Sequence, residues 1–198
     1  MQYGHAACNL GPVAHRRLRR SDNIGSVILP TERDPRLVTI RRGGSLTDAD
    51  HHLLALWAAT CAQHVLDLFE QERSDDPRPR HAIDAIRVWA RGEATMMPTR
   101  AAGGHAMAAA RDLRGAARHA AYAAGQAAVV AHVPEHDLGA AAYAIKAACA
   151  AAPRDQVEAV RHRECQWQRE QLPSGIRDLV IDDQHRRNSI CWSVFDTP

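Results

Sequence analysis

Two histidines and a glutamate form the pattern HxxEH at His132, Glu135 and His136. In one class of metalloprotease, the histidines of this pattern bind zinc from one helical face while the glutamate activates a water molecule. Pro134 stands inside the pattern, and a proline interrupts a helix because it lacks an N–H and its ring clashes with the preceding turn. We therefore interpret the motif as a junction, where His132 ends one helix and Glu135 enters the next. We predict neither a metal nor another cofactor.

Lys146 is the single lysine among the 25 lysine and arginine residues of the chain. A half-buried lysine can have a lowered pKa and act as a base or as an amine nucleophile. A lysine in the same place can equally extend along the helix surface and pair with a carboxylate such as Asp137 or Glu135. The sequence leaves both interpretations open, and it assigns no catalytic residue.

Three further polar side chains, His105, His119 and Tyr122, lie among alanines and glycines, whose small size leaves space around them. A small-molecule pocket can form in such a space between helices. Polar residues at a helix interface also serve to bond a neighbouring carbonyl or carboxylate. The first interpretation predicts a set of ligand-binding residues near the helix junctions. Its members are His105, His119, Tyr122, His132, His136 and Lys146.

An alanine-rich stretch must position these side chains. Alanine fills 24 of the 52 positions from 101 to 152, and it has the highest helix propensity because its side chain loses no entropy in a helix. It is also small enough to let neighbouring helices approach closely. One helix over residues 98–133 would be roughly 54 Å long, whereas a domain of this size is only about 40 Å across. We therefore predict a break at Asp112–Gly115.

Capping residues and prolines predict the other helices. The expected helices are Thr47–Glu72, Pro79–Gly92, 98–113, 116–132, Pro134–Ala152, Asp155–Pro173 and a short one capped by Ser174. The predicted fold class is all-α, a single compact bundle of about seven helices packed as antiparallel hairpins. Residues 1–33 are predicted to be an irregular or disordered N-terminal extension of a helical domain at 34–198. Within that domain we expect a short extended piece at 34–44 and an apolar C-terminus that docks on the bundle.

Composition and charge exclude several classes of protein. No apolar run approaches the roughly 20 residues that span a bilayer, and the first 20 residues lack the apolar core of a secretory signal. The five scattered cysteines are typical of reduced thiols, so we predict a cytoplasmic protein. A formal net charge of +2 is too small to indicate nucleic-acid binding. The basic clusters at 16–20 and 186–187 keep a nucleic-acid or partner contact open as an alternative.

Six segments of the chain resemble a family of bacterial proteins, from Asp34 to Phe195 overall. The segments are 46–51 (LTDADH), 54–59 (LALWAA), 61–66 (CAQHVL), 116–121 (AARHAA), 138–147 (LGAAAYAIKA) and 167–173 (WQREQLP). Through these segments the chain resembles the all-helical, alanine-rich immunity proteins of polymorphic-toxin systems.

The resemblance implies a protein without catalysis of its own, which neutralises a cognate toxin by covering the toxin's active site. A slightly basic chain suits a nuclease poorly as that toxin, because inhibitors of nucleases tend to be acidic and mimic phosphates. Two alternatives stay open. The first is a small-molecule binder or enzyme that uses the predicted pocket, and the second is a homodimer paired through the alanine-rich faces.

Overall fold

The computed structural model describes residues 29–196, and these residues form an all-α structure, as predicted. Seven helices have 13 to 17 residues, and one more is a single turn of 4 residues. The helices are α1 (Asp48–His64), α2 (Asp67–Glu70), α3 (Arg78–Ala90), α4 (Met96–Ala109), α5 (Gly115–Val129), α6 (Asp137–Ala151), α7 (Val157–Glu170) and α8 (Ser174–Arg187). Three 3-10 turns accompany them: η1 (Pro35–Leu37), η2 (Ile40–Arg42) and η3 (Pro134–His136).

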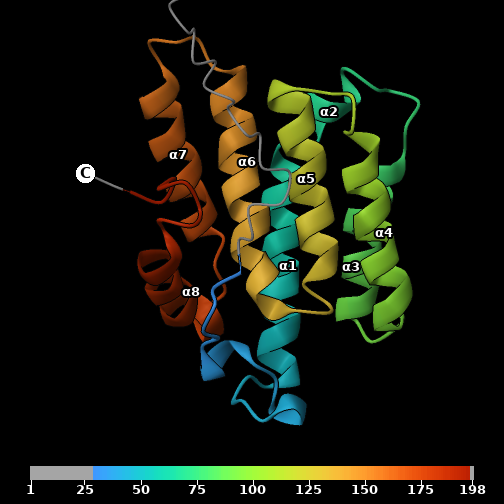
Figure 1. Cartoon of the computed structure of the whole chain (residues 1–198), viewed down its shortest axis with the longest axis vertical. Helices are drawn as coiled ribbons and strands as arrows, with labels where there is room; N and C mark the ends of the chain where they lie inside the picture. Colours follow the sequence, from blue (N-terminus) through green and yellow to red (C-terminus); the bar gives the residue numbers. More distant parts are fainter. Residues whose placement is uncertain (1–28, 197–198) are drawn as a thin grey trace, which may run out of the picture.

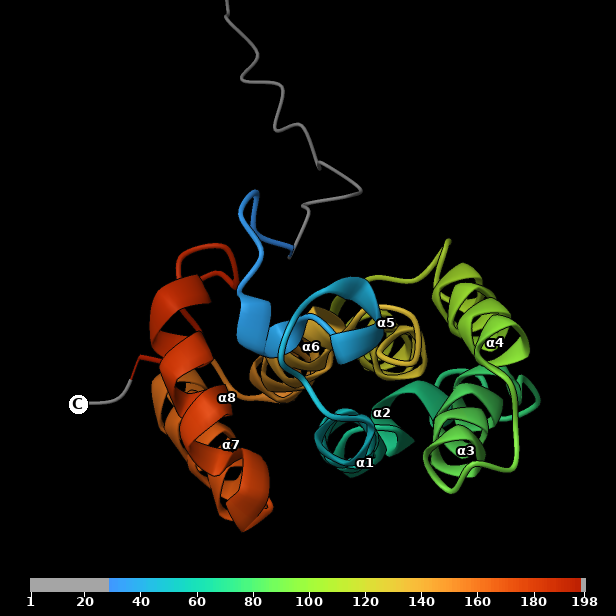
Figure 2. The same ribbon diagram turned by 90° about the horizontal axis from the view of Figure 1, so that it is seen from below.

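Helix α5 is the centre of the bundle. It packs most extensively on α6 and α4, and it also contacts α1, α2 and α3. Viewed along the helices, α4, α5 and α6 form one row, α1 and α3 face it from a second row, and α7 and α8 close one side (Figure 2). Consecutive helices from α3 to α7 contact one another, which gives the predicted succession of hairpins (Figure 1).

Small side chains make this packing possible. Ten of the fifteen residues of α5 are buried, and eight of them are alanine or glycine. At the crossing of α4 and α5, a Cβ atom on Gly103 would lie 2.7 Å from the carbonyl oxygen of Gly125. The two backbones therefore touch directly. Larger side chains fill the remaining core, and Trp57 of α1 also donates its indole N–H to the carbonyl oxygen of Gln168 on α7, at 2.8 Å.

The predicted break between the two central helices is confirmed, because α4 ends at Ala109 and α5 begins at Gly115. The single helix expected from Thr47 to Glu72 is wrong. Thr47 does cap α1, accepting the N–H of Asp50 at 3.0 Å, but the chain leaves the helix at Val65. The chain turns between α1 and α2, and Val65, Leu66 and Phe69 are buried at this turn.

The expected extended piece at 34–44 is also wrong. The segment folds into η1 and η2, and one isolated bridge links Thr39 to Leu46, because residues 29–196 contain no second strand that could pair with it. Asp155 and Ser174 do not cap helices either: Gln156 and Pro173 hold the positions before α7 and α8.

The apolar C-terminus docks on the bundle as predicted, with Cys191, Val194 and Phe195 buried. Residues 1–28 of the expected N-terminal extension, including the basic cluster at 16–20, lie outside the described residues. None of the helices between residues 29 and 196 has both the length and the hydropathy needed to span a bilayer.

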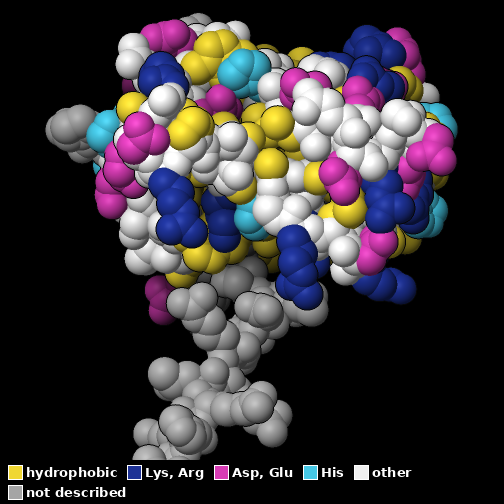
Figure 3. Space-filling view, turned by 90° about the horizontal axis from the view of Figure 1, so that it is seen from above, with side chains coloured by type: hydrophobic (Ala, Val, Ile, Leu, Met, Phe, Trp, Pro, Cys, Tyr) yellow, Lys and Arg dark blue, Asp and Glu magenta, His cyan; other side chains and the backbone are white. Residues whose placement is uncertain are grey.

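The two ends of the bundle differ in their surfaces. At the end away from η1 and η2, acidic and basic side chains are interspersed around apolar patches (Figure 3). The opposite end, beneath η2, is hollowed and is dominated by cationic and imidazole side chains.

Candidate functional site

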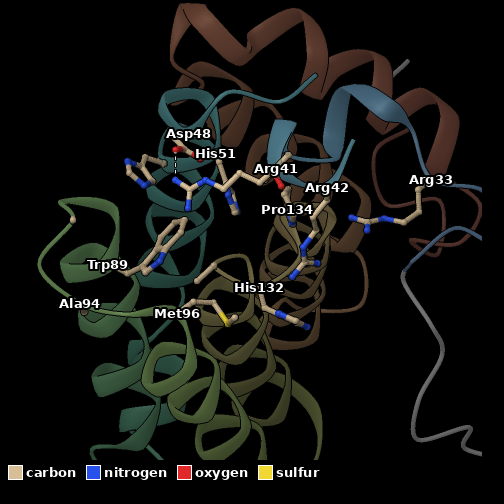
Figure 4. A pocket seen from close by; sticks show the side chains of 14 residues that line it. Arg33, Arg41, Arg42, Asp48, His51, Trp89, Ala94, Met96, His132 and Pro134 are labelled. Carbon is tan, nitrogen blue, oxygen red and sulfur yellow. Dashed lines mark hydrogen bonds and ion pairs between the residues drawn. The ribbon is translucent and has the colours of Figure 1, made fainter. Parts of the chain in front are cut away.

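A cavity of about 550 Å³ opens at the end of the bundle where α1 and α4 begin and α3 and α5 end (Figure 4). The alternating directions of the helices bring these four ends together. Local sequence signals set each end: Thr47 caps α1, Gly92 ends α3 with a positive φ of 78°, and Pro134 follows the turn after α5. The turn η2 covers the remaining side of this space, which we call the basic cavity.

Three arginines line the basic cavity. Arg33 forms a two-pronged ion pair with Glu135, with N–O distances of 2.6 and 2.5 Å. Arg41 pairs with Asp48 at 2.5 Å, shown as the dashed line in Figure 4. No carboxylate between residues 29 and 196 pairs with Arg42, whose side chain extends from η2 toward His132 in the same view. The lining therefore keeps one uncompensated cation.

Three histidines complete the polar wall. His51 donates its Nε2–H to the carbonyl oxygen of Val130 at 2.7 Å, which fixes the tautomer because a carbonyl can only accept. The rings of His51 and His52 both meet Trp89 edge-on, at centroid distances of 4.9 and 4.8 Å. His132 has a buried Nδ1 atom that finds no hydrogen-bond partner among the described residues.

Burial lowers the pKa of both His51 and His132. The charges of Arg100, Arg42 and Arg33 lower the pKa of His132 further. Both imidazoles are therefore neutral at pH 7, while the arginines keep their charge. A half-enclosed site with excess positive charge focuses its field on an anion that enters it. Its geometry suits binding of a carboxylate or phosphate group, with Trp89 and Met96 as an apolar wall.

The structure distributes the six predicted ligand-binding residues over several places. His132 lines the basic cavity. His136 lies behind it and donates its Nδ1–H to Gln126 at 2.7 Å, and burial lowers its pKa to about 4. His105 lines a separate hollow of about 300 Å³ between α3 and α4.

The other three, His119, Tyr122 and Lys146, do meet. Tyr143 connects them, because its ring lies 5.9 Å from that of His119 and 5.1 Å from that of Tyr122. The ammonium of Lys146 lies 3.8 Å from the ring centre of Trp192, which also contacts Tyr143. Burial lowers the pKa of His119 to about 4 and also lowers that of Lys146. One interpretation of the sequence pairs Lys146 with Asp137 or Glu135. In the structure its partner is the aromatic ring of Trp192.

The HxxEH pattern is divided as its proline indicates. Glu135 faces Arg33, His136 faces Gln126 and His132 faces the cavity, so their side chains point to different partners. Across residues 29–196, no group of three or more His, Cys, Asp or Glu side chains is arranged to hold a metal ion.

The second basic cluster, Arg186-Arg187, does not form one patch. Arg186 pairs with Asp34, and Arg187 is buried against Asp183 and Asp137. Sequence reasoning also missed Arg42, His51, His52 and Trp89 as site residues. The pairs Arg41-Arg42 and His51-His52 lie on either side of the Thr47 cap. Their placement near one helix start was the sequence signal that could have identified them. No sequence signal brings Trp89 to them, because α3 reaches this end only through the hairpin packing.

Comparison with known proteins gives one match. Residues 44–175, which include α1 to α7, match the family described as Imm-5 like putative immunity protein. The matched range begins at Gly44, two residues after Arg42, and ends at Gly175 near the start of α8. No curated protein and no solved structure matches the chain. The match covers well over half of the sequence and agrees with the resemblance seen in its helical segments, so the chain belongs to the Imm-5 like putative immunity protein family.

Proposed function

We propose that this protein neutralises a cognate toxin by binding to it and covering its active site. Family membership carries the proposal, since an immunity protein acts on a toxin partner. The architecture supports it, because direct backbone contact between α4 and α5 and a densely buried α5 give a stiff surface. A preformed surface loses little conformational freedom when it binds, which favours tight association.

The cluster around Lys146 supports a structural role better than a small-molecule site. Trp192 lies over Lys146 and against Tyr143, so the C-terminal segment occupies the faces that a ligand would use. Glu135, the glutamate of the HxxEH pattern, is likewise engaged in an ion pair with Arg33. The alanine faces that could pair two copies are covered within the chain by α4, α5 and α6. We therefore expect the free protein to be a monomer.

The test is to identify a candidate toxin domain encoded next to the gene of this protein, and to produce that domain alone and together with this protein. We expect the toxin to arrest growth when alone, and co-production to restore growth and yield a stoichiometric complex in size-exclusion chromatography. Toxin activity should be lost in the purified complex and should return when the complex dissociates. Growth arrest that co-production does not relieve, with two separate elution peaks, would refute the proposal.

A further inference from the structure

We propose that the basic cavity receives an acidic side chain of the partner protein, an Asp or Glu carboxylate that pairs with Arg42 beside His132. The inference rests on the proposed function and adds where the toxin docks and which chemistry it presents there. It depends on three observations at the same end of the bundle.

The first observation is the charge of the lining. Asp48 is the one carboxylate that lines the basic cavity, and it is already paired with Arg41. Glu135 similarly compensates Arg33. The remaining charge is that of Arg42, exposed and without an ion pair in the described part of the chain. A partner that brings one carboxylate would complete the set, as complementary potentials do across protein interfaces.

The second observation concerns the uncharged groups around Arg42. Among residues 29–196, the buried Nδ1 atom of His132 has no hydrogen-bond partner, and such an unsatisfied group calls for an explanation because burying it costs stability. The rings of His51 and His52 both contact Trp89 edge-on, which fixes the indole as part of the cavity wall. Tryptophan and arginine are enriched where binding energy concentrates in interfaces, and methionine is enriched in interfaces generally.

The third observation distinguishes a protein from a small anion. Only three large hydrophobic side chains of residues 29–196 are exposed, and two of them lie at this end. Ile40 (61% exposed) sits in η2 next to Arg41, and Met97 (58% exposed) follows Met96 at the start of α4. A free phosphate gains nothing from apolar residues around the site, whereas a protein surface buries them.

The experiment compares two charge reversals in the full chain. Arg42→Glu changes the cavity, and Arg154→Glu makes the same change in an exposed loop after α6, which at 15 residues places it roughly 22 Å from η3. Circular dichroism first checks that both variants keep the helical fold, since neither arginine forms an ion pair in the described structure. Affinity and association rate for the toxin are then measured as a function of salt.

We expect Arg154→Glu to bind like the wild type, and Arg42→Glu to bind about tenfold more weakly or worse, with slower association and a weaker salt dependence. Scanning the toxin's acidic residues to Arg should yield one substitution that restores binding to Arg42→Glu. Wild-type affinity for Arg42→Glu would overturn the cavity assignment and leave the proposed function standing.

Failure of the unaltered chain to bind the toxin would instead overturn the proposed function, and the docking assignment with it. Inorganic pyrophosphate gives a separate readout. If it binds in the micromolar range through Arg42 while Arg42→Glu still binds the toxin normally, the cavity serves a small phosphate ligand and the protein-docking assignment is wrong.

Discussion

At the residue scale, Trp192 and Ser193 adopt a left-handed backbone conformation, with φ of 60° and 55°. Residues with a Cβ rarely do so, because the side chain approaches the following carbonyl oxygen. The turn places the indole of Trp192 over Lys146 and buries Val194 and Phe195 behind it. The packing of these three side chains offsets the local strain.

Ser193→Gly should therefore stabilise the protein. Glycine removes a left-handed cost of about 1–2 kcal/mol, offset in part by its larger unfolded-state entropy, about 0.4–1 kcal/mol. The expected gain in the free energy of unfolding is about 0.5–1 kcal/mol, measured by urea denaturation. Ser189→Gly is the matched control, since Ser189 is exposed and its φ is not positive. It should destabilise, and a gain there equal to that of Ser193→Gly would contradict the strain argument.

His119 gives the protein a pH-dependent stability. Burial lowers its pKa to about 4 in the folded state, whereas an unfolded histidine titrates near its ordinary value of 6.5. Between these values the unfolded chain takes up a proton that the folded chain does not. The free energy of unfolding should therefore fall as the pH drops from about 6.5 to about 4, by about 1 kcal/mol per pH unit.

His119→Phe removes this proton uptake while keeping an aromatic ring next to Tyr143. Urea denaturation at pH 7, 6 and 5 should show a shallower loss of stability in the variant than in the wild type. His136, also with a pKa near 4, remains and accounts for part of the residual slope. Identical slopes in the two proteins would show that His119 takes up its proton as readily in the folded state as in the unfolded state.

At the scale of elements, α4 and α5 cross in direct backbone contact at the centre of the bundle. A Cβ atom on Gly125 would lie 2.4 Å from Met107 Cγ and 2.8 Å from the carbonyl oxygen of Gly103. Because one of these neighbours is backbone, the crossing cannot relax by a side-chain rotation alone. Gly103 and Gly125 are therefore needed because the two helices approach too closely for a Cβ atom, and not because their backbone conformation requires glycine.

Gly103→Ala should destabilise the protein by about 1–3 kcal/mol, because it forces α4 and α5 apart. The next residue is a matched control. A Cβ atom on Gly104 meets nothing within 4 Å, so Gly104→Ala should gain about 0.5–1 kcal/mol from helix propensity. Thermal denaturation of both variants tests the contrast. If the two substitutions changed stability in the same direction, the helices would not be in direct contact at this point.

At the scale of the whole molecule, the two segments that flank the family match hold each other across one end of the bundle. Arg36 of η1 pairs with Asp182 of α8, and Arg186 of α8 pairs with Asp34. The segment of η1 lies beside α8 in both ribbon views (Figures 1 and 2). The clasp lies next to η2, which lines the basic cavity, so the proposed docking surface depends on segments beyond the matched range.

Arg187 lies beneath the clasp, next to Arg186 on α8. It is buried, donates to the carboxylate of Asp183 at 2.8 Å and to the carbonyl oxygen of Glu135 at 2.8 Å, and contacts Asp137 at 3.3 Å. Burial raises the pKa of Asp137 to about 7, and the charge of Arg187 opposes that rise. The group connects α8 to η3 and the start of α6.

Arg187→Met should cost about 3–5 kcal/mol, because it leaves Asp183 and Asp137 buried without their cation. Arg186→Met, one residue earlier, removes an arginine from a more exposed ion pair and should cost about 1 kcal/mol or less. Equilibrium unfolding of both variants at pH 7 checks the difference. A loss for Arg187→Met as small as that for Arg186→Met would mean that α8 is held by apolar contacts alone.

The composition of the chain determined the class of its fold and most of its helix limits. Alanine propensity, the Thr47 cap, Gly92 and the prolines act within a few residues, so their effects can be read locally. Tertiary structure decided the rest, because a side chain's partners depend on how hairpins pack. The turn at Val65, the approach of Arg42 to His132 and the contact of Lys146 with Trp192 all depend on residues that are far apart along the chain or covered by other helices.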